Sequence, residues 1–207
     1  MQLRQWKFWQ QWSCDPEAHI RLEELRHSGD LSQVPELQAM IGVPQDPIWH
    51  PEGDVWIHTV YVCEQATQIA SRDGLSSIDQ TVLMMAALCH DIGKASTTSL
   101  IDGKWRAFRH AEIGGQICAR FLEDLACPPE INDQVRALVE EHLVYASYEK
   151  ASKRAIKRLL KRLEPAGFEQ LQRLIEADHS GRPPLPKALP DKVLEMRRVW
   201  LSLKRDK

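Results

Sequence analysis

The chain has 207 residues, 43% of them hydrophobic and 27% charged, and a formal net charge of −2 at pH 7. This composition is that of an ordinary water-soluble globular protein. The length suits one large domain, whose core needs no disulfide or structural metal to hold it together. Because the net charge is close to zero, the whole molecule has no general attraction for nucleic acid or membranes, and any such attraction must be local.

The cysteines and the apolar runs indicate a cytoplasmic protein. Five cysteines are scattered without a C-x-x-C pair, which is typical of reduced thiols that pack in a cytosolic protein. They are Cys14, Cys63, Cys89, Cys118 and Cys127. The longest apolar run, residues 82–89, is far too short to span a bilayer, and the polar N-terminus is not a signal peptide. We therefore expect a cytoplasmic location and no membrane contact.

Apolar residues recur at three- and four-residue spacing along most of the chain, which is the pattern of amphipathic helices, and strand signals are nearly absent. The predicted helices cover residues 16–27, 55–72, 77–91, 110–125, 130–147, 151–163, 167–179 and 190–205. Asp15 followed by Pro16 predicts a helix start, and Ser77 with Gln80 resembles a capping box. Gly93 would permit a left-handed turn after its helix. We predict a single all-α helical domain.

Six histidine and aspartate side chains fall at helix ends or on inward helix faces. They are His58, His90, Asp91, His110, His142 and Asp178. Neutral imidazole and ionised carboxylate are suitable ligands for Mn, Fe, Co, Ni, Zn or Mg if they converge from different segments of a helical bundle. Helical spacing does not show that they meet, because a single histidine on a half-apolar helix is more often a core or surface residue. Asp178 could equally cap a helix or pair with Arg182.

Four segments in a fixed order resemble a known family. They read GVPQDPIWHPEGDVWIHT at 42–59, AALCHDIGKA at 86–95, HAEIGG at 110–115 and EADHSGR at 176–182. Together they resemble the HD superfamily of metal-dependent phosphohydrolases, and more closely the HD domain of bacterial CCA-adding tRNA nucleotidyltransferases. The resemblance implies an HD-domain helical bundle at 42–186, a helical extension at 1–41 and a C-terminal helix at 187–207 on the same domain. Because only about 40 residues precede it, we expect a free-standing hydrolase half without CCA addition.

The resemblance also assigns roles to individual residues. His58, His90, Asp91 and Asp178 match the metal-binding set of the family, and His110 and His142 match positions that bind a second ion in two-metal members. Lys94 matches a lysine that lies near substrate phosphate, so Asp91 and Lys94 are the expected catalytic residues. Weaker candidates are Arg109 and Arg182 for substrate phosphate, and Glu52 and Glu141 for orienting the histidines.

The function that follows from these assignments is a phosphodiesterase or phosphatase that uses one or two divalent metal ions (Mn, Fe, Ni, Co, Zn or Mg). Its substrate would be a nucleotide or an RNA-terminal phosphate ester, such as a 2′,3′-cyclic phosphate. The alternative is a non-catalytic nucleotide- or RNA-binding HD module. A pure binding module has no need for six converging metal-type donors, which favours the enzyme.

A basic helix is expected near the C-terminus. Its charged side, within residues 150–162, holds Lys150, Lys153, Arg154, Lys157, Arg158, Lys161 and Arg162. Ala155, Ile156, Leu159, Leu160 and Leu163 occupy the other side. A solvated face over a core stripe explains this pattern, and a face that contacts the phosphates of RNA or a nucleotide explains it as well.

Three tryptophans near the N-terminus recur at three-residue spacing, at Trp6, Trp9 and Trp12. We expect them to dock the N-terminal segment on the bundle rather than to stack on bases. A contact between copies of the chain is a further alternative, and the oligomeric state is left open.

Overall fold

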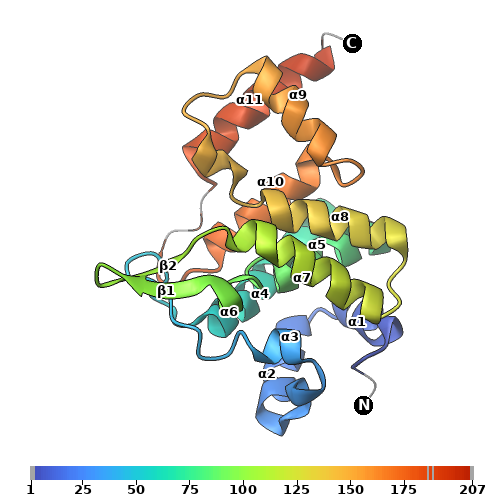
Figure 1. Ribbon diagram of the computed structural model, residues 1–207. Coiled ribbons are helices and arrows are strands. Elements are labelled where there is room, and N and C mark those ends of the chain that lie inside the picture. The colour runs from blue at the N-terminus through green and yellow to red at the C-terminus, as the bar shows by residue number, and fades with distance from the viewer. Residues whose placement is uncertain (1–2, 186, 188, 206–207) are drawn as a thin grey trace.

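The computed structural model describes residues 3–185, 187 and 189–205, and these form a helical bundle with one small β-hairpin (Figure 1). The N-terminal helices are α1 (Trp6–Ser13), α2 (Ala18–Ser28) and α3 (Pro35–Gln38), with a 3-10 turn η1 (Asp30–Gln33). The bundle contains α4 (Val55–Asp73), α5 (Ser77–Cys89), α7 (His110–Asp124), α8 (Pro129–Glu141) and α10 (Gly167–Ser180). The other elements are α6 (Lys94–Thr97), β1 (Thr98–Ile101), β2 (Lys104–Ala107), η2 (Val144–Ser147), α9 (Lys153–Arg162) and α11 (Asp191–Arg205). The predicted all-α class is confirmed.

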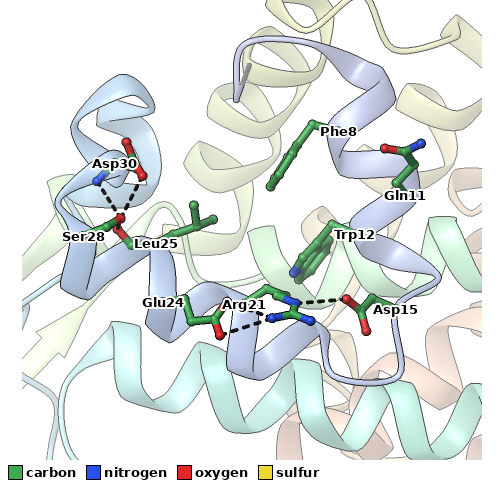
Figure 2. A pocket seen from close by; sticks show the side chains of 9 residues that line it. All are labelled: Phe8, Gln11, Trp12, Asp15, Arg21, Glu24, Leu25, Ser28 and Asp30. Carbon is green, nitrogen blue, oxygen red and sulfur yellow. Dashed lines mark hydrogen bonds and ion pairs between the residues drawn. The ribbon is translucent and has the colours of Figure 1, made fainter. Parts of the chain in front are cut away.

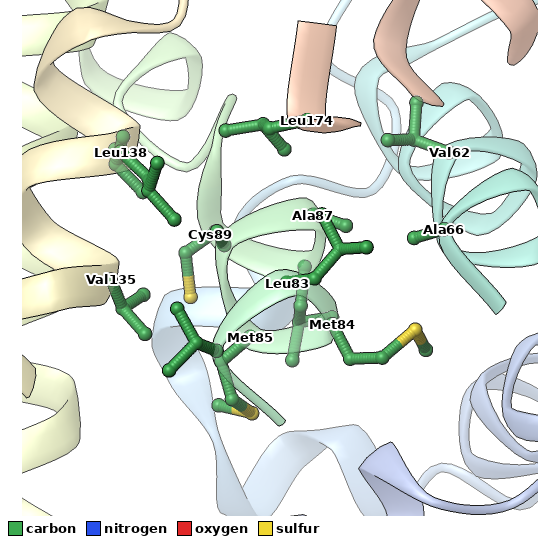
Figure 3. Packing of buried hydrophobic residues seen from close by; sticks show 14 of the residues in the cluster. Val62, Ala66, Leu83, Met84, Met85, Ala87, Cys89, Val135, Leu138 and Leu174 are labelled. Carbon is green, nitrogen blue, oxygen red and sulfur yellow. The ribbon is translucent and has the colours of Figure 1, made fainter. Parts of the chain in front are cut away.

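Helix α5 lies at the centre of the bundle because it is apolar on every side. Every residue from Thr81 to Cys89 is buried, and α5 contacts α4, α8 and α10. Figure 3 shows Val62 of α4 and Val135 of α8 on opposite sides of this helix, with Leu174 of α10 across its end. A helix that is hydrophobic all round is stable only when other helices cover it on all sides. In the described part of the chain, no helix combines the length and the apolar character needed to cross a bilayer.

Three expectations about helix ends differ from the structure. The cap of α5 is Ser76, one residue earlier than expected, and its hydroxyl accepts from the backbone N–H of Asp79. Asp15 does not cap α2 directly, since its carboxylate accepts from the N–H of Glu17, which precedes the helix. Gly93 is not left-handed, because its φ of −68° and ψ of −20° are ordinary helical values. The role of this glycine must therefore be steric.

The predicted helix over 130–147 is two elements. Helix α8 ends at Glu141, and the short turn η2 follows at Val144–Ser147. Leu143, with φ of −100° and ψ of 5°, breaks the helical geometry between them. Val144 and Tyr145 still pack against the core. The helical spacing of apolar residues therefore extends beyond the end of the helix itself.

The stretch at 93–109, which none of the predicted helices covers, contains α6 and a hairpin that projects from the side of the bundle (Figure 1). Strands β1 and β2 pair antiparallel, with Leu100 opposite Trp105 and Thr98 opposite Ala107. Because facing residues of an antiparallel pair point to the same side, these four side chains share one face of the hairpin. Each strand is only four residues long, which explains why no alternation was visible in the sequence.

The N-terminal tryptophans dock on the bundle as predicted. Trp9 is fully buried, its ring meets Phe121 of α7 edge-on at 6.0 Å, and its indole N–H donates to the carbonyl of Leu3 at 2.8 Å. The indole N–H of Trp12 donates to Ala18 at 2.8 Å. These contacts explain the three-residue spacing as packing.

A hollow of about 430 Å³ lies between α1 and α2, with Phe8, Trp12 and Leu25 directed into it (Figure 2). The guanidinium of Arg21 bonds to Asp15 at 3.3 Å and to Glu24 at 3.0 Å at its edge. Its described lining includes none of the predicted site residues, so this hollow is separate from the site described below.

Helices α9 and α11 stand together at one end of the molecule, beyond α8 and α10 (Figure 1). Helix α9 begins at Lys153, so Lys150 precedes it and is not on its face as expected. Its apolar side is buried through Ala155, Ile156 and Leu159. Helix α11 contacts α9 and η2. The domain boundary proposed at 186 lies outside the described residues.

Candidate metal centre

Five helix ends bring the six predicted side chains into one buried cluster. His58 lies in the first turn of α4, which begins where the carboxylate of Asp54 accepts from the N–H of Ile57. His90 and Asp91 follow the last turn of α5, and His110 is the first residue of α7. His142 follows α8, and Asp178 lies in the last turn of α10. All six residues are at most 9% exposed.

The first part of the cluster consists of His58, His90 and Asp178. The Nε2 atom of His58 lies 3.1 Å from Oδ1 of Asp178 and 3.3 Å from Nε2 of His90. These three atoms lie within 4.8 Å of one another, close enough to share one cation. They come from α4, α5 and α10, which the contacts around α5 hold in place.

Asp91 connects this part to a second one. Its Oδ2 lies 3.2 Å from Nε2 of His90 and 3.8 Å from Nε2 of His58. Its Oδ1 lies 3.3 Å from Nε2 of His110 and 3.8 Å from Nε2 of His142. Asp91, His110 and His142 thus form a second set of possible metal ligands. The two oxygens of one carboxylate face both sets.

The backbone fixes which nitrogen of each imidazole faces the cluster. Nδ1 of His90 lies 2.8 Å from the carbonyl of Ala87, and Nδ1 of His142 lies 2.7 Å from that of Val139. His110 has the same arrangement, with 2.6 Å from Nδ1 to the carbonyl oxygen of Ala107. A carbonyl only accepts, so Nδ1 carries the proton and Nε2 of the neutral ring presents a lone pair inward.

The carboxylate of Glu52 fixes the orientation of the His58 ring, as the backbone carbonyls do for the other three histidines. Its Oε1 accepts from Nδ1 of His58 at 2.8 Å and from Nδ1 of His50 at 2.9 Å, and its side chain is fully buried. Although burial opposes it, these hydrogen bonds lower the pKa of Glu52 to about 2. Burial lowers the pKa of His50 to about 4. Glu141, the other glutamate expected to orient a histidine, instead pairs with Arg162 of α9.

His50 was not among the predicted site residues, although it lies next to the cluster. Its ring meets that of His58 at 4.6 Å between centroids. The segment HPEGD, in which His50 and Glu52 are two residues apart, was the signal that could have identified it.

The expected phosphate-binding residues differ in their positions. Nζ of Lys94 lies 2.7 Å from Oδ2 of Asp91, and it donates to Oε1 of Gln45 at 2.7 Å. Arg182 donates to Oδ1 of Asp178 at 2.5 Å. Arg109 does not take part in the cluster: it is exposed and pairs with Glu112 at 2.6 Å.

Burial and neighbouring charges set the protonation states of the cluster. Burial alone would raise the pKa of Asp91, yet Lys94 and His90 hold it well below its ordinary value. Asp178 is likewise ionised, because Arg182 and His58 outweigh its burial. Burial lowers the pKa of His142 to about 3, so this imidazole is neutral at pH 7. Ionised carboxylates and neutral imidazoles are the forms that bind metals.

The cluster fits a metal ion on its own geometry. Two imidazole nitrogens, Nε2 of His58 and Nε2 of His90, face each other at 3.3 Å. Nε2 of His110 is buried without a hydrogen-bond partner. Buried acceptors in this arrangement need a cation or proton between them. Donors about 2.0–2.2 Å from one ion lie about 3 Å from each other, which matches these separations.

The cluster opens into a cleft of about 610 Å³. Its lining includes Asp91, Lys94, His110, His142 and Arg182. Further lining residues come from residues 44–50, the hairpin and η2. The cleft is therefore an entrance from solvent to the buried donors.

Comparison with known proteins places this geometry in a family. The HD domain family matches residues 55–193. The chain is 31% identical over 185 residues to a Multifunctional CCA protein from Vibrio cholerae serotype O1 (strain M66-2), covering 85% of this chain and 43% of that protein. Identity to the Multifunctional CCA protein of Vibrio parahaemolyticus serotype O3:K6 (strain RIMD 2210633) is 30%, with 86% and 43% covered. The chain thus spans less than half the length of these relatives. Because the family match covers well over half of the chain, the chain belongs to the HD domain family.

Proposed function

We propose that this protein is a cytoplasmic metal-dependent phosphohydrolase that acts on a nucleotide or on an RNA-terminal phosphate ester, such as a 2′,3′-cyclic phosphate. The observation that carries the proposal is the inward orientation of four imidazole Nε2 atoms beside two carboxylates. A module that only binds nucleotides or RNA has no use for such a donor set at the bottom of a cleft.

Two ions can be assigned to the cluster. His58, His90, Asp91 and Asp178 would hold one, and Asp91, His110 and His142 would hold the other. The mixed donors suit Mn, Fe, Co, Ni, Zn or Mg. When bound, such ions lower the pKa of water and neutralise charge on phosphoryl oxygens.

The residues around the cluster have tasks of their own. Lys94, held between Asp91 and Gln45, presents a fixed positive charge to a phosphate oxygen or to the leaving group. Arg182 can pair with a second phosphate oxygen, since its Nε is buried without a partner while its NH2 group binds Asp178. These side chains bind and orient the phosphate before reaction.

Metal content and turnover test this proposal together. Purified protein is expected to retain a divalent metal, and with Mn or Ni it should hydrolyse bis-p-nitrophenyl phosphate and 2′,3′-cyclic nucleotides. Chelation should abolish turnover and lower Tm, because a ligand at a hundred times its Kd stabilises a fold by ~2.7 kcal/mol. Elemental analysis measures the retained metal, and a thermal melt measures the change in Tm. A metal-free protein that melts at the same temperature with and without chelator would contradict the proposal.

RNA is the proposed partner for the basic end of the molecule. Residues 148–165 hold seven Lys or Arg against two Asp or Glu, and residues 191–205 hold five against two. These segments, α9 and α11 with their flanks, carry a formal charge of +8 in a chain whose total is −2. Helix α11 contacts η2, which lines the cleft, so the basic end is joined to the cleft through η2. The resemblance to CCA-adding enzymes favours a tRNA-like substrate.

Exchanging three exposed basic residues of α9 is expected to weaken RNA binding in a salt-dependent way. The triple variant Lys157→Gln, Arg158→Gln, Lys161→Gln should reduce the slope of log K against log[salt] by about 2–3, because each phosphate contact contributes 0.7 to 0.9. Filter binding of a tRNA between 50 and 200 mM salt measures the slope.

A charge-matched control keeps this test specific. The variant Arg4→Gln, Lys7→Gln, Arg120→Gln removes the same number of exposed charges from α1, its flank and α7. Equal slopes for the two triple variants would show that α9 makes no specific contact, and a wild-type slope near zero would remove RNA as a partner.

A further inference from the structure

Three aromatic side chains line the cleft together with residues of the cluster. Trp49, Trp105 and Phe108 all line it, and they are 62%, 36% and 68% exposed. Large exposed aromatic rings beside a polar site are uncommon unless they bind something, because apolar surface is normally buried. None of these rings takes part in the cluster itself.

The hairpin fixes Trp105 relative to the cluster. Trp105 shares its face with Thr98 and Ala107, both of which also line the cleft. The carbonyl of Ala107 accepts from Nδ1 of His110, so the strand is tied directly to a proposed metal ligand. Trp105 lies two residues before Ala107 on the same strand, about 7 Å along the backbone from the carbonyl that holds the His110 ring.

Trp49 is held by a turn in the segment that precedes α4. The backbone carbonyl of Asp46 accepts from the N–H of Trp49 at 3.0 Å and of His50 at 2.9 Å, and its carboxylate accepts from Ile48. Gln45 of the same segment accepts from Lys94. The tryptophan is therefore in a segment bonded to the phosphate-binding lysine.

We propose that Trp49, Trp105 and Phe108 stack the nucleobase of the substrate while its phosphate lies at Lys94 and Arg182. This rests on the proposed function and names its specificity-determining residues. A ligand that contacts both the aromatic rings and the cations Lys94 and Arg182 combines a planar ring with an anionic phosphate, as a nucleotide does. Stacking tolerates any base, since every base has an aromatic face.

Two cyclic phosphates, one with a nucleoside and one without ribose ring or base, test the inference. The variant Trp105→Ala is expected to raise KM for 2′,3′-cyclic AMP by about 5- to 100-fold, the range that loss of one base stack produces. KM for glycerol 1,2-cyclic phosphate, which has no base, should be unchanged. The variant Trp105→Phe should retain most of the affinity, because it keeps an aromatic face.

Leu100→Ala is the matched control. Leu100 is the cross-strand neighbour of Trp105 on the same hairpin face, is 59% exposed, and lies outside the residues that line the cleft. Leu100→Ala should leave KM for both substrates unchanged. If Trp105→Ala raised KM for both substrates equally, or for neither, the inference would be overturned and the hydrolase proposal would stand. A change of oligomeric state without a change in KM would likewise overturn it, since the wall would then be a protein interface.

Equilibrium binding separates the inference from the enzymatic proposal. If no variant hydrolyses either compound, the hydrolase proposal fails, and calorimetric titration of adenosine 3′-monophosphate against glycerol 2-phosphate decides the stacking alone. Tighter binding of the nucleotide that is lost in Trp105→Ala supports it. Equal binding of the two ligands overturns it.

Discussion

Replacing Asp91 with asparagine is expected to abolish retention of the metal and to lower turnover at least about a hundredfold. Loss of a residue that merely orients a metal ligand already costs 10- to 100-fold, and Asp91 stands in a more direct position. Its Oδ2 lies 3.2 Å from Nε2 of His90 and its Oδ1 lies 3.3 Å from Nε2 of His110. Asparagine preserves the shape but presents one neutral oxygen and an amide that repels a cation. Elemental analysis and turnover of a 2′,3′-cyclic nucleotide measure the two effects.

The control for this variant is Asp124→Asn, at the exposed end of α7, which should behave as wild type in both measurements. Far-ultraviolet circular dichroism must show that Asp91→Asn is folded. A folded variant that keeps its metal and most of its activity would show that the two donor sets do not depend on a shared carboxylate, and the proposed metal centre would be wrong.

The sequence predicted which residues meet, but only through the resemblance. Helical spacing placed His58 and Asp178 on different helices, 120 positions apart, and nothing in the spacing brings them to the observed 3.1 Å. The ordered motifs did so. The orienting contacts were less predictable. Of the two glutamates expected to orient histidines, Glu52 contacts His58, whereas Glu141 bonds Arg162 on another helix. Tertiary contacts of exposed charges are not encoded in local spacing.

Helix existence was predicted better than helix ends and strands. The central helix was identified because an apolar run of that kind has to be buried. The hairpin was missed because six of its eight strand positions are exposed and only Thr98 and Ala107 are half-buried, so no alternation of buried and exposed residues was present. The end of α8 was missed because Val144 and Tyr145 stay apolar after the helix has delivered His142.

Gly93 illustrates a residue whose role is visible only in three dimensions. As a glycine after a helix it suggested a left-handed cap, yet its backbone is helical. A Cβ atom at this position would lie 2.1 Å from the carbonyl oxygen of His110 and 2.7 Å from the backbone nitrogen of Gly114. The chain segment after Asp91 therefore passes directly against the start of α7. This close approach brings His110 to the carboxylate that it faces.

Gly93→Ala is expected to lower the free energy of unfolding by about 3 kcal/mol or more, the upper end for overpacking, because both obstructing atoms belong to backbone and cannot rotate away. For a chain of this size that corresponds to a Tm lower by about 6–12 °C. The variant should also lose metal affinity, since separating the two backbones moves His110 away from Asp91. Urea unfolding and elemental analysis measure the two effects.

Gly115→Ala, one turn into α7, is the matched comparison. Its added Cβ would lie 2.3 Å from Cγ of Glu140, but that atom belongs to a half-buried side chain that can move, and alanine favours a helix over glycine by ~1 kcal/mol. We expect a change within about 1 kcal/mol of wild type and full metal retention, since no histidine depends on this contact. Equal free energies of unfolding and equal metal retention for Gly93→Ala and Gly115→Ala would contradict this prediction. The close approach of the two backbones would then not be what positions His110, and only the hydrogen bond to the carbonyl of Ala107 would hold its ring.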